Sequence, residues 1–269
     1  LESTGVALET HRFGGRLDLQ TKRRMRAHLE SFEVDVALSW MSRAARFCPR
    51  GVWTNAARLG GYYSLKYYQN CQAFVGNTEG ICDYLRKQGV PAEKVHYIPN
   101  FIDERPMPAD DATQFPATQG DTGSILMAAG RLHRNKGFDV LIEALSAVPS
   151  ATLWLAGEGP ERTHLAQLAQ RLGVRDRVEF LGWQDDLRPY LQRADVFVCS
   201  SRIEPLGNVV LEAWRQGCPL VAARAAGPRE LITDGRTGSL CDLEDAAGMA
   251  RAITQLLGSA TQRQHYSAA

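Results

Sequence analysis

From residue 124 onward, short apolar runs alternate with amphipathic segments whose apolar positions recur at helical spacing. The expected strands are residues 125–129, 152–156, 178–181, 195–199 and 219–222. The expected helices are residues 138–148, 161–172, 187–193, 208–216, 228–232 and 245–257. Strands that alternate with helices across short loops indicate βαβ units and a parallel sheet covered on both faces. Because such sheets bind ligands at the carboxyl ends of their strands, the polar loops after the strands are the candidate site.

The first 105 residues show a less regular version of the same α/β pattern. Residues 34–38 and 73–76 are expected strands. Residues 78–88 are an expected helix that begins near Thr78 and ends at Gly89. Residues 106–123 are rich in Pro, Asp, Ala, Thr and Gln, and we expect them to link two domains.

Composition agrees with two domains, because 269 residues exceed the usual size of one. The net charge of +1 gives no global field for nucleic acid, and no nucleic-acid partner is expected. The charge is uneven: residues 1–105 hold 15 Lys and Arg against 11 Asp and Glu, and residues 106–269 hold 16 against 19. The cations concentrate in residues 21–26. This stretch is either a solvated helix face or a patch that meets anionic lipid head groups or an acidic substrate.

The six cysteines include no Cys-x-x-Cys pair and no Cys/His cluster with zinc spacing, so no metal site is expected. Cys199 and Cys218 lie in apolar runs and are expected to be buried small side chains. No signal peptide and no apolar stretch of about 18 residues is found. The expected location is the cytoplasm, and the basic stretch makes peripheral contact with the inner face of the membrane a candidate.

The loop after the first strand of the second half carries two cations, Arg131 and Lys136, between Gly130 and Gly137. A guanidinium offers a fork of donors that suits phosphate, and an ammonium offers a compact charge. Together they could hold a diphosphate and stabilise it as it leaves. The alternative is a basic loop in solvent. The loop is not a Walker motif, because no Gly precedes Lys136 and no Ser or Thr follows it.

The next strand is followed by Gly157, Glu158 and Gly159. This Gly-x-Gly resembles the start of a dinucleotide fingerprint, but Arg162 occupies the place of the third glycine. NAD binding is therefore not expected.

A second polar loop, residues 200–207, precedes an apolar helix and contains Glu204. Gly207 and Asn208 mark the helix start, where unpaired backbone N–H groups and a small residue favour an anion. Glu212 lies about one turn into the helix, and a carboxylate that faces inward needs a partner such as ribose hydroxyls. The alternative is that Glu204 complements the helix dipole and Glu212 is solvated.

These motifs, in this order, resemble the C-terminal domain of family 4 glycosyltransferases over about residues 122–257. The similarity also includes Phe180 to Gly182, Gly217 to Pro219, Gly227 to Glu230 and Gly235 to Gly238. Residues 76–85 and 95–103 are similar to the end of the family's N-terminal domain. The resemblance implies the GT-B architecture, in which two Rossmann-like domains with parallel sheets face a cleft.

The resemblance also implies roles for individual residues. Arg131 and Lys136 would bind the donor diphosphate and stabilise its charge, and Glu204 would contact the donor sugar; these three are the catalytic candidates. Glu212 would hold the ribose, and the loop at Trp183 would border the base, although that indole could equally be packing. The other donor-binding candidates are Gly130, Gly157, Glu158, Gly159, Pro205, Leu206, Gly207, Asn208 and Val209.

The chain departs from the family pattern at both ends. No opening strand with a Gly-rich turn is present, so residues 1–105 are expected to be a partial, acceptor-side N-terminal domain. Residues 124–257 are the expected donor-binding domain, and residues 258–269 a truncated C-terminal tail. A histidine found in the family's N-terminal domain has no match in residues 53–58, where Asn55 or Arg58 could face the cleft instead.

The implied reaction is transfer of a sugar, of the hexosyltransferase type, from a nucleotide diphosphate to an acceptor hydroxyl with retained anomeric configuration. The chain contains no Asp-x-Asp, which fits metal-independent catalysis without a cofactor. The expected acceptor is a glycan or a lipid-linked glycan of bacterial polysaccharide or lipopolysaccharide assembly. Three alternatives stay open: a glycoside hydrolase that uses Glu204 and Glu212, a nucleotide-sugar epimerase, and a donor-binding module without turnover. The base, the sugar and the acceptor stay open as well.

Overall fold

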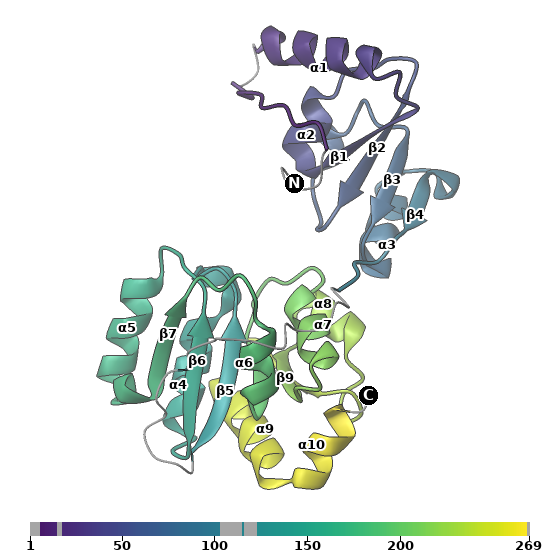
Figure 1. The fold of residues 1–269 in the computed structure, drawn as a ribbon. Helices are drawn as coiled ribbons and strands as arrows, with labels where there is room; N and C mark the ends of the chain where they lie inside the picture. The colour runs from purple at the N-terminus through teal and green to yellow at the C-terminus, as the bar shows by residue number, and fades with distance from the viewer. Residues whose placement is uncertain (1–5, 15–17, 103–114, 116–122, 268–269) are drawn as a thin grey trace. The chain divides into compact units, whose positions relative to one another are not determined.

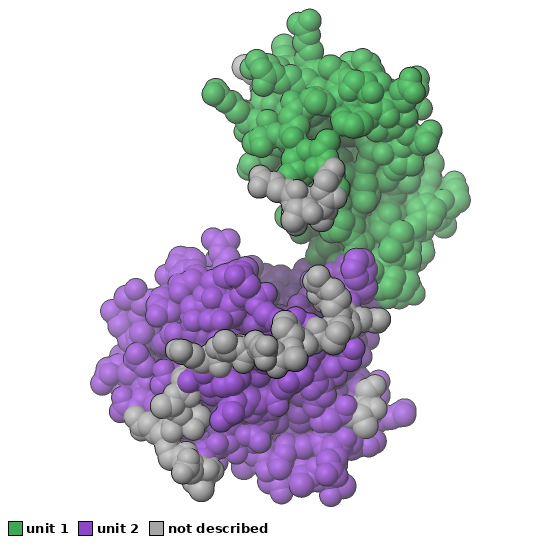
Figure 2. Space-filling view, viewed as in Figure 1, with its two compact units in different colours: residues 1–99 green, residues 100–269 purple. Residues whose placement is uncertain are grey.

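The computed structural model describes residues 6–14, 18–102, 115 and 123–267. The chain divides into two compact units, residues 1–99 and residues 100–269, coloured green and purple in Figure 2. Each unit contains a parallel sheet with helices, as Figure 1 shows. The predicted linker, residues 106–123, lies outside the described residues except for Phe115 and Gly123.

The first unit is built on a four-stranded parallel sheet with the order β1-β2-β3-β4. Its strands are β1 (Val36–Trp40), β2 (Thr54–Leu59), β3 (Ala73–Gly76) and β4 (Val95–Tyr97). Its helices are α1 (Leu19–Ser31), α2 (Met41–Phe47) and α3 (Glu79–Lys87), with short 3-10 turns η2 (Leu65–Tyr67) and η3 (Ala92–Lys94). The predicted strand at residues 73–76 and the helix that starts after Thr78 are confirmed; the Thr78 side chain accepts a hydrogen bond from the N–H of Ile81.

Strand β2 was not predicted, because its sequence Thr-Asn-Ala-Ala-Arg-Leu mixes polar and small residues. Asn55 in this strand is fully buried. Its side chain donates to the carbonyl oxygens of Pro49 and Asn70 at 3.0 and 3.1 Å. It accepts from Trp53 Nε1 at 2.8 Å. The expectation that Asn55 faces a cleft is therefore wrong, because its amide is buried and hydrogen-bonded within the core.

Arg58 lies near the carboxyl end of β2 and is only partly exposed. Its guanidinium lies 4.9 Å from the centre of the Trp40 ring and donates to the carbonyl of Ile98 at 3.1 Å. A role for Arg58 with a substrate stays a prediction.

The second unit is built on a six-stranded parallel sheet with the order β10-β9-β8-β5-β6-β7. Its strands are β5 (Ser124–Ala129), β6 (Ala151–Ala156), β7 (Val178–Gly182), β8 (Val196–Cys199), β9 (Leu220–Ala223) and β10 (Ser239–Cys241). Its helices are α4 (Phe138–Ser146), α5 (Arg162–Arg171), α6 (Arg188–Arg193), α7 (Asn208–Arg215), α8 (Ala226–Leu231), α9 (Ala246–Gly258) and α10 (Ala260–Ser267), with 3-10 turns η4 (Arg134–Lys136) and η5 (Arg175–Arg177). The predicted elements are confirmed to within two residues; β10 and α10 were not predicted.

Strand β5 supplies the core on both faces of this sheet because its successive side chains point to opposite sides. Leu126 packs in a cluster with residues of α4, α5 and α9. Met127 packs in a second cluster with residues of α6 and α7. Figure 1 shows the helices over the two faces of the sheet.

The strand order reverses at β5, which pairs with β6 on one side and β8 on the other. At such a switch point the loops after the two neighbouring strands run in opposite directions and leave a crevice at the carboxyl ends. The loops after β5 and β8 are residues 130–137 and 200–207, which the sequence marks as the candidate site.

Three further features concern composition and partners. Cys199 and Cys218 are buried as predicted, and all six cysteines are free thiols. Over the described ranges, no helix is both long and apolar enough to cross a membrane. No group of three or more His, Cys, Asp or Glu side chains that could hold a metal ion is found among the same residues.

Candidate functional site

The loops after β5 and β8 are in direct contact. The backbone N–H of Arg202 donates to the carbonyl of Asn135 at 2.8 Å, and Ser200 Oγ donates to the carbonyl of Lys136 at 2.9 Å. Gly137 allows this approach: its φ is +62°, and a Cβ there would lie 2.1 Å from the carbonyl oxygen of Ser200. A larger side chain at residue 137 would therefore force the loops apart.

Lys136 and Glu204 meet where these loops touch. Lys136 Nζ donates to Glu204 Oε2 at 2.5 Å, and the two side chains are only 24% and 12% exposed. Ser201 Oγ donates to the same carboxylate oxygen at 3.2 Å. Two of the predicted catalytic residues, 68 positions apart in the sequence, are thus brought together, with the lysine charge held near the switch point.

Arg131, the third predicted catalytic residue, begins the same loop as Lys136, one residue after Gly130. Its side chain is exposed and makes no hydrogen bond or ion pair with any residue that the structure describes. A guanidinium in this position has all its donors available to an anion.

The predicted loop 157–159 lies beside the loop after β5. The N–H of Leu132 donates to the carbonyl of Glu158 at 2.9 Å, and the N–H of Gly130 donates to the carbonyl of Ala156 at 3.0 Å. The Glu158 side chain is more than half exposed and lies 3.5 Å from Arg162. These close backbone contacts explain why residues 157 and 159 are glycines. A Cβ atom at Gly157 or Gly159 would lie 1.9 or 2.3 Å, respectively, from a carbonyl oxygen of the neighbouring loop.

Helix α7 begins at Asn208, directly after the loop that carries Glu204. Gly207 is its N-cap with a φ of +93°, and no side chain caps the first turn. The first backbone N–H groups are therefore left for another acceptor. Leu206 is buried, which fixes the entry into the helix, whereas Pro205 and Val209 are partly exposed.

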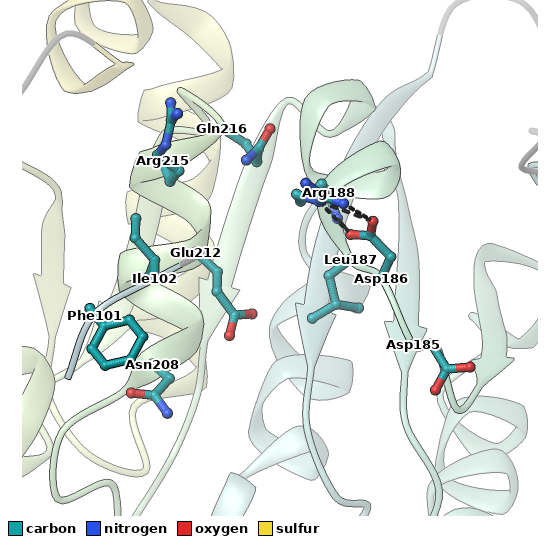
Figure 3. A pocket seen from close by; sticks show the side chains of 10 residues that line it. All are labelled: Phe101, Ile102, Asp185, Asp186, Leu187, Arg188, Asn208, Glu212, Arg215 and Gln216. Atoms are coloured by element: carbon teal, nitrogen blue, oxygen red, sulfur yellow. Dashed lines mark hydrogen bonds and ion pairs between the residues drawn. The ribbon is translucent and has the colours of Figure 1, made fainter. Parts of the chain in front are cut away.

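A cavity of about 400 Å³ lies along α7 on the side of α6, as Figure 3 shows. Glu212 projects into it from α7, facing the loop before α6. The residues that line it are Phe101, Ile102, Asp185, Asp186, Leu187, Arg188, Asn208, Glu212, Arg215 and Gln216. Of the predicted site residues, only Asn208 and Glu212 line this cavity.

The cavity contains both an ion pair and a carboxylate to which no described residue donates. Arg188 forms an ion pair with Asp186 at 2.6 Å. Burial, and then the nearby Asp186 carboxylate, raise the pKa of Glu212 above its ordinary value. Glu212 accepts no hydrogen bond from any described residue, so hydroxyl donors from a ligand would stabilise its charged form.

Trp183, predicted to border a base, is 71% exposed, and its Nε1 donates to Asp185 Oδ1 at 2.8 Å. Asp185 lines the cavity and Trp183 does not. Trp183 therefore lies next to the cavity, beside its hydrogen-bond partner Asp185.

Sequence reasoning missed several residues of this region. Asp186 could have been found, because an aspartate in a loop often accepts a hydrogen bond from the backbone N–H two residues on. Asp186 Oδ1 accepts from the N–H of Arg188, the first residue of α6, at 2.9 Å. Phe101 follows the motif of residues 95–100, but nothing local shows that it lies beside α7. Arg202 lies between two motif residues and was also overlooked.

The protein-family model described as "Glycosyl transferases group 1" matches residues 123–259. Among curated proteins, the lipopolysaccharide core biosynthesis glycosyltransferase LpsE of Rhizobium meliloti (strain 1021) is 42% identical over 232 residues, which cover 85% of this chain and 67% of that protein. The lipopolysaccharide core biosynthesis glycosyltransferase LpsD of the same organism is 39% identical over 251 residues, which cover 92% of this chain and 72% of that protein.

Among solved structures, Anabaena Alr3699/HepE in complex with UDP and glucose has a TM-score of 0.79 at 22% sequence identity, over 96% of this chain and 77% of that one. The lipopolysaccharide outer core galactosyltransferase WaaB in its apo form has a TM-score of 0.66 at 17% identity, over 89% and 70%. These likenesses confirm the predicted α/β GT-B fold with parallel sheets. By its sequence and its fold, this chain belongs to the group 1 glycosyl transferases.

Proposed function

We propose that this glycosyltransferase moves a sugar from a nucleotide-diphosphate donor to an acceptor hydroxyl with retention of anomeric configuration. The observation that supports the proposal is the pairing of Lys136 with Glu204 at the switch point, beside the uncapped start of α7. A cation, a carboxylate and free backbone donors at one sheet edge suit a phosphate that is joined to a sugar.

The proposed roles follow from the charge of each group. Arg131, Lys136 and the first N–H groups of α7 hold the diphosphate and stabilise the negative charge that develops as it leaves. Glu204 leaves its lysine to accept hydrogen bonds from the sugar hydroxyls. Glu212 accepts from the ribose hydroxyls in the cavity.

In the proposed reaction the bond from the anomeric carbon to the phosphate oxygen breaks, and a bond to the acceptor oxygen forms on the same face. The acceptor proton passes to the departing phosphate oxygen. Because fixed cations and helix N–H groups supply the positive charge at the phosphate, we propose that neither a metal ion nor another cofactor is required.

Two similarities support a choice of substrates. LpsE and LpsD are named for lipopolysaccharide core biosynthesis, and the structure of Alr3699/HepE contains UDP and glucose. We therefore propose a UDP-sugar donor and a lipopolysaccharide core acceptor. Exposed cations of α1, namely Lys22, Arg23, Arg24 and Arg26, suit contact with an anionic membrane surface that presents such an acceptor. No retention of the chain by anionic vesicles at low salt would contradict the membrane contact.

Calorimetric titration of the chain with UDP, GDP and ADP tests the donor site. We expect UDP to bind most tightly. Arg131→Ala and Glu212→Ala should each weaken binding by about 10-fold, the effect of one hydrogen bond to a charged group. Arg171→Ala, an exposed arginine at the end of α5, is the matched control and should bind like the wild type. Equal affinity in all four proteins would contradict the proposed site.

Product analysis separates the alternatives. Incubation with a UDP-sugar and core oligosaccharide should lengthen the oligosaccharide and release UDP. Conversion of the donor sugar without an acceptor would show an epimerase. Release of free sugar from a glycan in the absence of nucleotide would show a glycoside hydrolase. Donor binding with no product would show a binding module.

A further inference from the structure

Arg202 lies two residues before Glu204, and its guanidinium is surrounded by acceptors from three other segments. It donates to both carboxylate oxygens of Asp139 at 2.7 and 2.8 Å. It donates to both carboxylate oxygens of Glu244, in one case at 2.8 Å. It also donates to the backbone carbonyl of Arg134 at 2.8 Å. One side chain therefore connects four places in the unit.

The connected segments are those that position the catalytic candidates. Arg134 belongs to η4, the turn that ends at Lys136. Asp139 is in the first turn of α4, two residues after Gly137. Arg202 and Glu204 share the loop after β8. The guanidinium thus contacts residues on both sides of Lys136 and belongs to the same loop as the partner of Lys136.

The backbone of this loop adds to the connection. The N–H groups of Arg202 and Ile203 both donate to the carbonyl of Asn135, at 2.8 and 3.2 Å. With the side-chain contact to Arg134, successive carbonyls of η4 are held by the loop after β8. Such a cluster of short contacts leaves little freedom for the two loops to separate.

The charges of this cluster bear on a site for an anion. Asp139 and Glu244 are two carboxylates close to the loop that is proposed to bind a diphosphate. Burial opposes ionisation of Asp139, but the hydrogen bonds and charge of Arg202 outweigh it and lower the pKa of the carboxyl. The hydrogen bonds from Arg202 lower the pKa of Glu244 as well. Arg202 therefore offsets part of the negative charge of two carboxylates that would otherwise repel the donor phosphates.

We propose that Arg202 is a positioning residue of the transferase site: it holds the loop of Lys136 against the loop of Glu204 and offsets part of the negative charge of Asp139 and Glu244. The proposal rests on the function proposed above for Lys136 and Glu204. It assigns to Arg202 no contact with the donor itself.

A lysine cannot take this place. The planar guanidinium presents five N–H donors as a fork, which lets it bind two carboxylates and a carbonyl together. An ammonium has three donors on one atom and could satisfy only part of the cluster. Arg202→Lys keeps the charge and removes the bridge, so it separates positioning from simple electrostatics.

The test is a double-mutant cycle on nucleotide affinity, measured by calorimetry with UDP, or with GDP or ADP if the wild type prefers one of them. Arg202→Lys and Lys136→Ala should each weaken binding by about 10-fold. The double variant should bind about as weakly as Lys136→Ala alone, because Arg202 acts through the position of Lys136. Additive losses in the double variant would overturn the proposal.

A stability control removes the remaining explanation, that Arg202 only keeps the unit folded. Arg177 is a second arginine that bridges segments, through the backbone carbonyls of Leu145, Val148 and Ala151. Arg177→Ala should lower the melting temperature and leave nucleotide affinity within about 2-fold of the wild type. If Arg177→Ala weakens affinity as much as Arg202→Lys, the effect of Arg202 is structural only.

The same titrations distinguish the two proposals. Absence of nucleotide binding by the folded wild type would overturn the proposed function, and the role of Arg202 with it. Nucleotide binding that depends on Lys136 but shows no loss in Arg202→Lys would overturn the role of Arg202 alone.

Discussion

The first strands of the two sheets differ in how they are covered. In β5 of the second unit, every residue after Ser124 is buried, and side chains on both faces pack against helices. In β1 of the first unit, burial alternates, and Val36, Leu38 and Trp40 are each about half exposed or more. A parallel sheet is normally buried on both faces. Burial on both faces gives continuous apolar runs, which explains why β5 to β9 of the second unit were predicted from the sequence. In the first unit, β2 was missed because polar and small residues interrupt its apolar run.

The difference also concerns the candidate site. The second unit pairs Lys136 with Glu204 at the sheet edge and places Glu212 in the cavity along α7. In the first unit, the candidate Asn55 proved to be part of the core. The mixed sequence of β2 thus obscured both this strand and the buried position of Asn55 within it.

The largest effect should come from the core of the second unit. Leu126 is fully buried, and Leu126→Ala should cost about 2–5 kcal/mol of the free energy of unfolding, because it leaves a cavity. Leu38→Ala in β1 should cost about 0.5 kcal/mol, because the side chain is half exposed. Urea denaturation measures both. Similar losses of unfolding free energy in the two variants would show that the exposed face of β1 is covered in solution. The two strands would then not differ in burial.

The next effect concerns the chemical step. Lys136→Ala should lower kcat for sugar transfer by about 100-fold or more, because a charge that stabilises the leaving phosphate is lost. The matched control in the first unit is Lys87→Ala, an exposed lysine at the end of α3, which should transfer at the wild-type rate. Steady-state kinetics with a UDP-sugar and core oligosaccharide measures kcat for each variant. A decrease in kcat of less than about 3-fold in Lys136→Ala would show that Lys136 is not a catalytic residue.

A smaller effect is expected from Glu212, whose folded-state pKa is raised, first by burial and then by Asp186. For a carboxyl of this kind, the contribution to stability is fully present below the unfolded pKa and is lost as pH rises through the folded pKa. Glu212→Gln does not titrate, so its melting temperature should exceed that of the wild type increasingly as pH rises through this window. Thermal scans from pH 4 to 8 without nucleotide measure the difference.

The same variant should bind UDP about 10-fold more weakly at pH 7, because an amide accepts ribose hydrogen bonds less strongly than a carboxylate. Higher stability of Glu212→Gln together with weaker UDP binding would show that Glu212 lowers the stability of the fold and serves ligand binding. A variant that is less stable than the wild type at every pH would show instead that Glu212 supports the fold.

The smallest effect is expected at acid pH. Asp139 and Glu244 have lowered pKa values, so their contribution to stability is present above the unfolded pKa and is lost as pH falls through the folded pKa. Arg202→Lys should therefore reduce the acid-side slope of the melting temperature below about pH 5. An unchanged slope would mean that Arg202 does not set the ionisation of this pair.

The sequence allowed the motifs of the site to be identified but not their contacts. Gly207 and Asn208 were expected at a helix start from local signals, and α7 begins there. The cavity beside Glu212 could not be predicted, because Phe101 and Asp186 reach it from distant parts of the chain. Arg202 was missed for the same reason: its partners Asp139 and Glu244 are 63 and 42 residues away, and no local pattern connects them.

By itself, the sequence determined the alternation of strands and helices in the second unit, the glycines at its loop contacts and the cations of the loop after β5. These depend on short-range periodicity and on backbone conformations that few residues adopt. Only the tertiary structure decided that β5 lies between β6 and β8. That strand order brings Lys136 to Glu204. In the first unit, the position of β2 between β1 and β3 leaves Asn55 inside the core. The physical reason is that the pairing of strands and the burial of polar groups are settled by contacts between residues far apart in the chain, which local hydrophobicity does not encode.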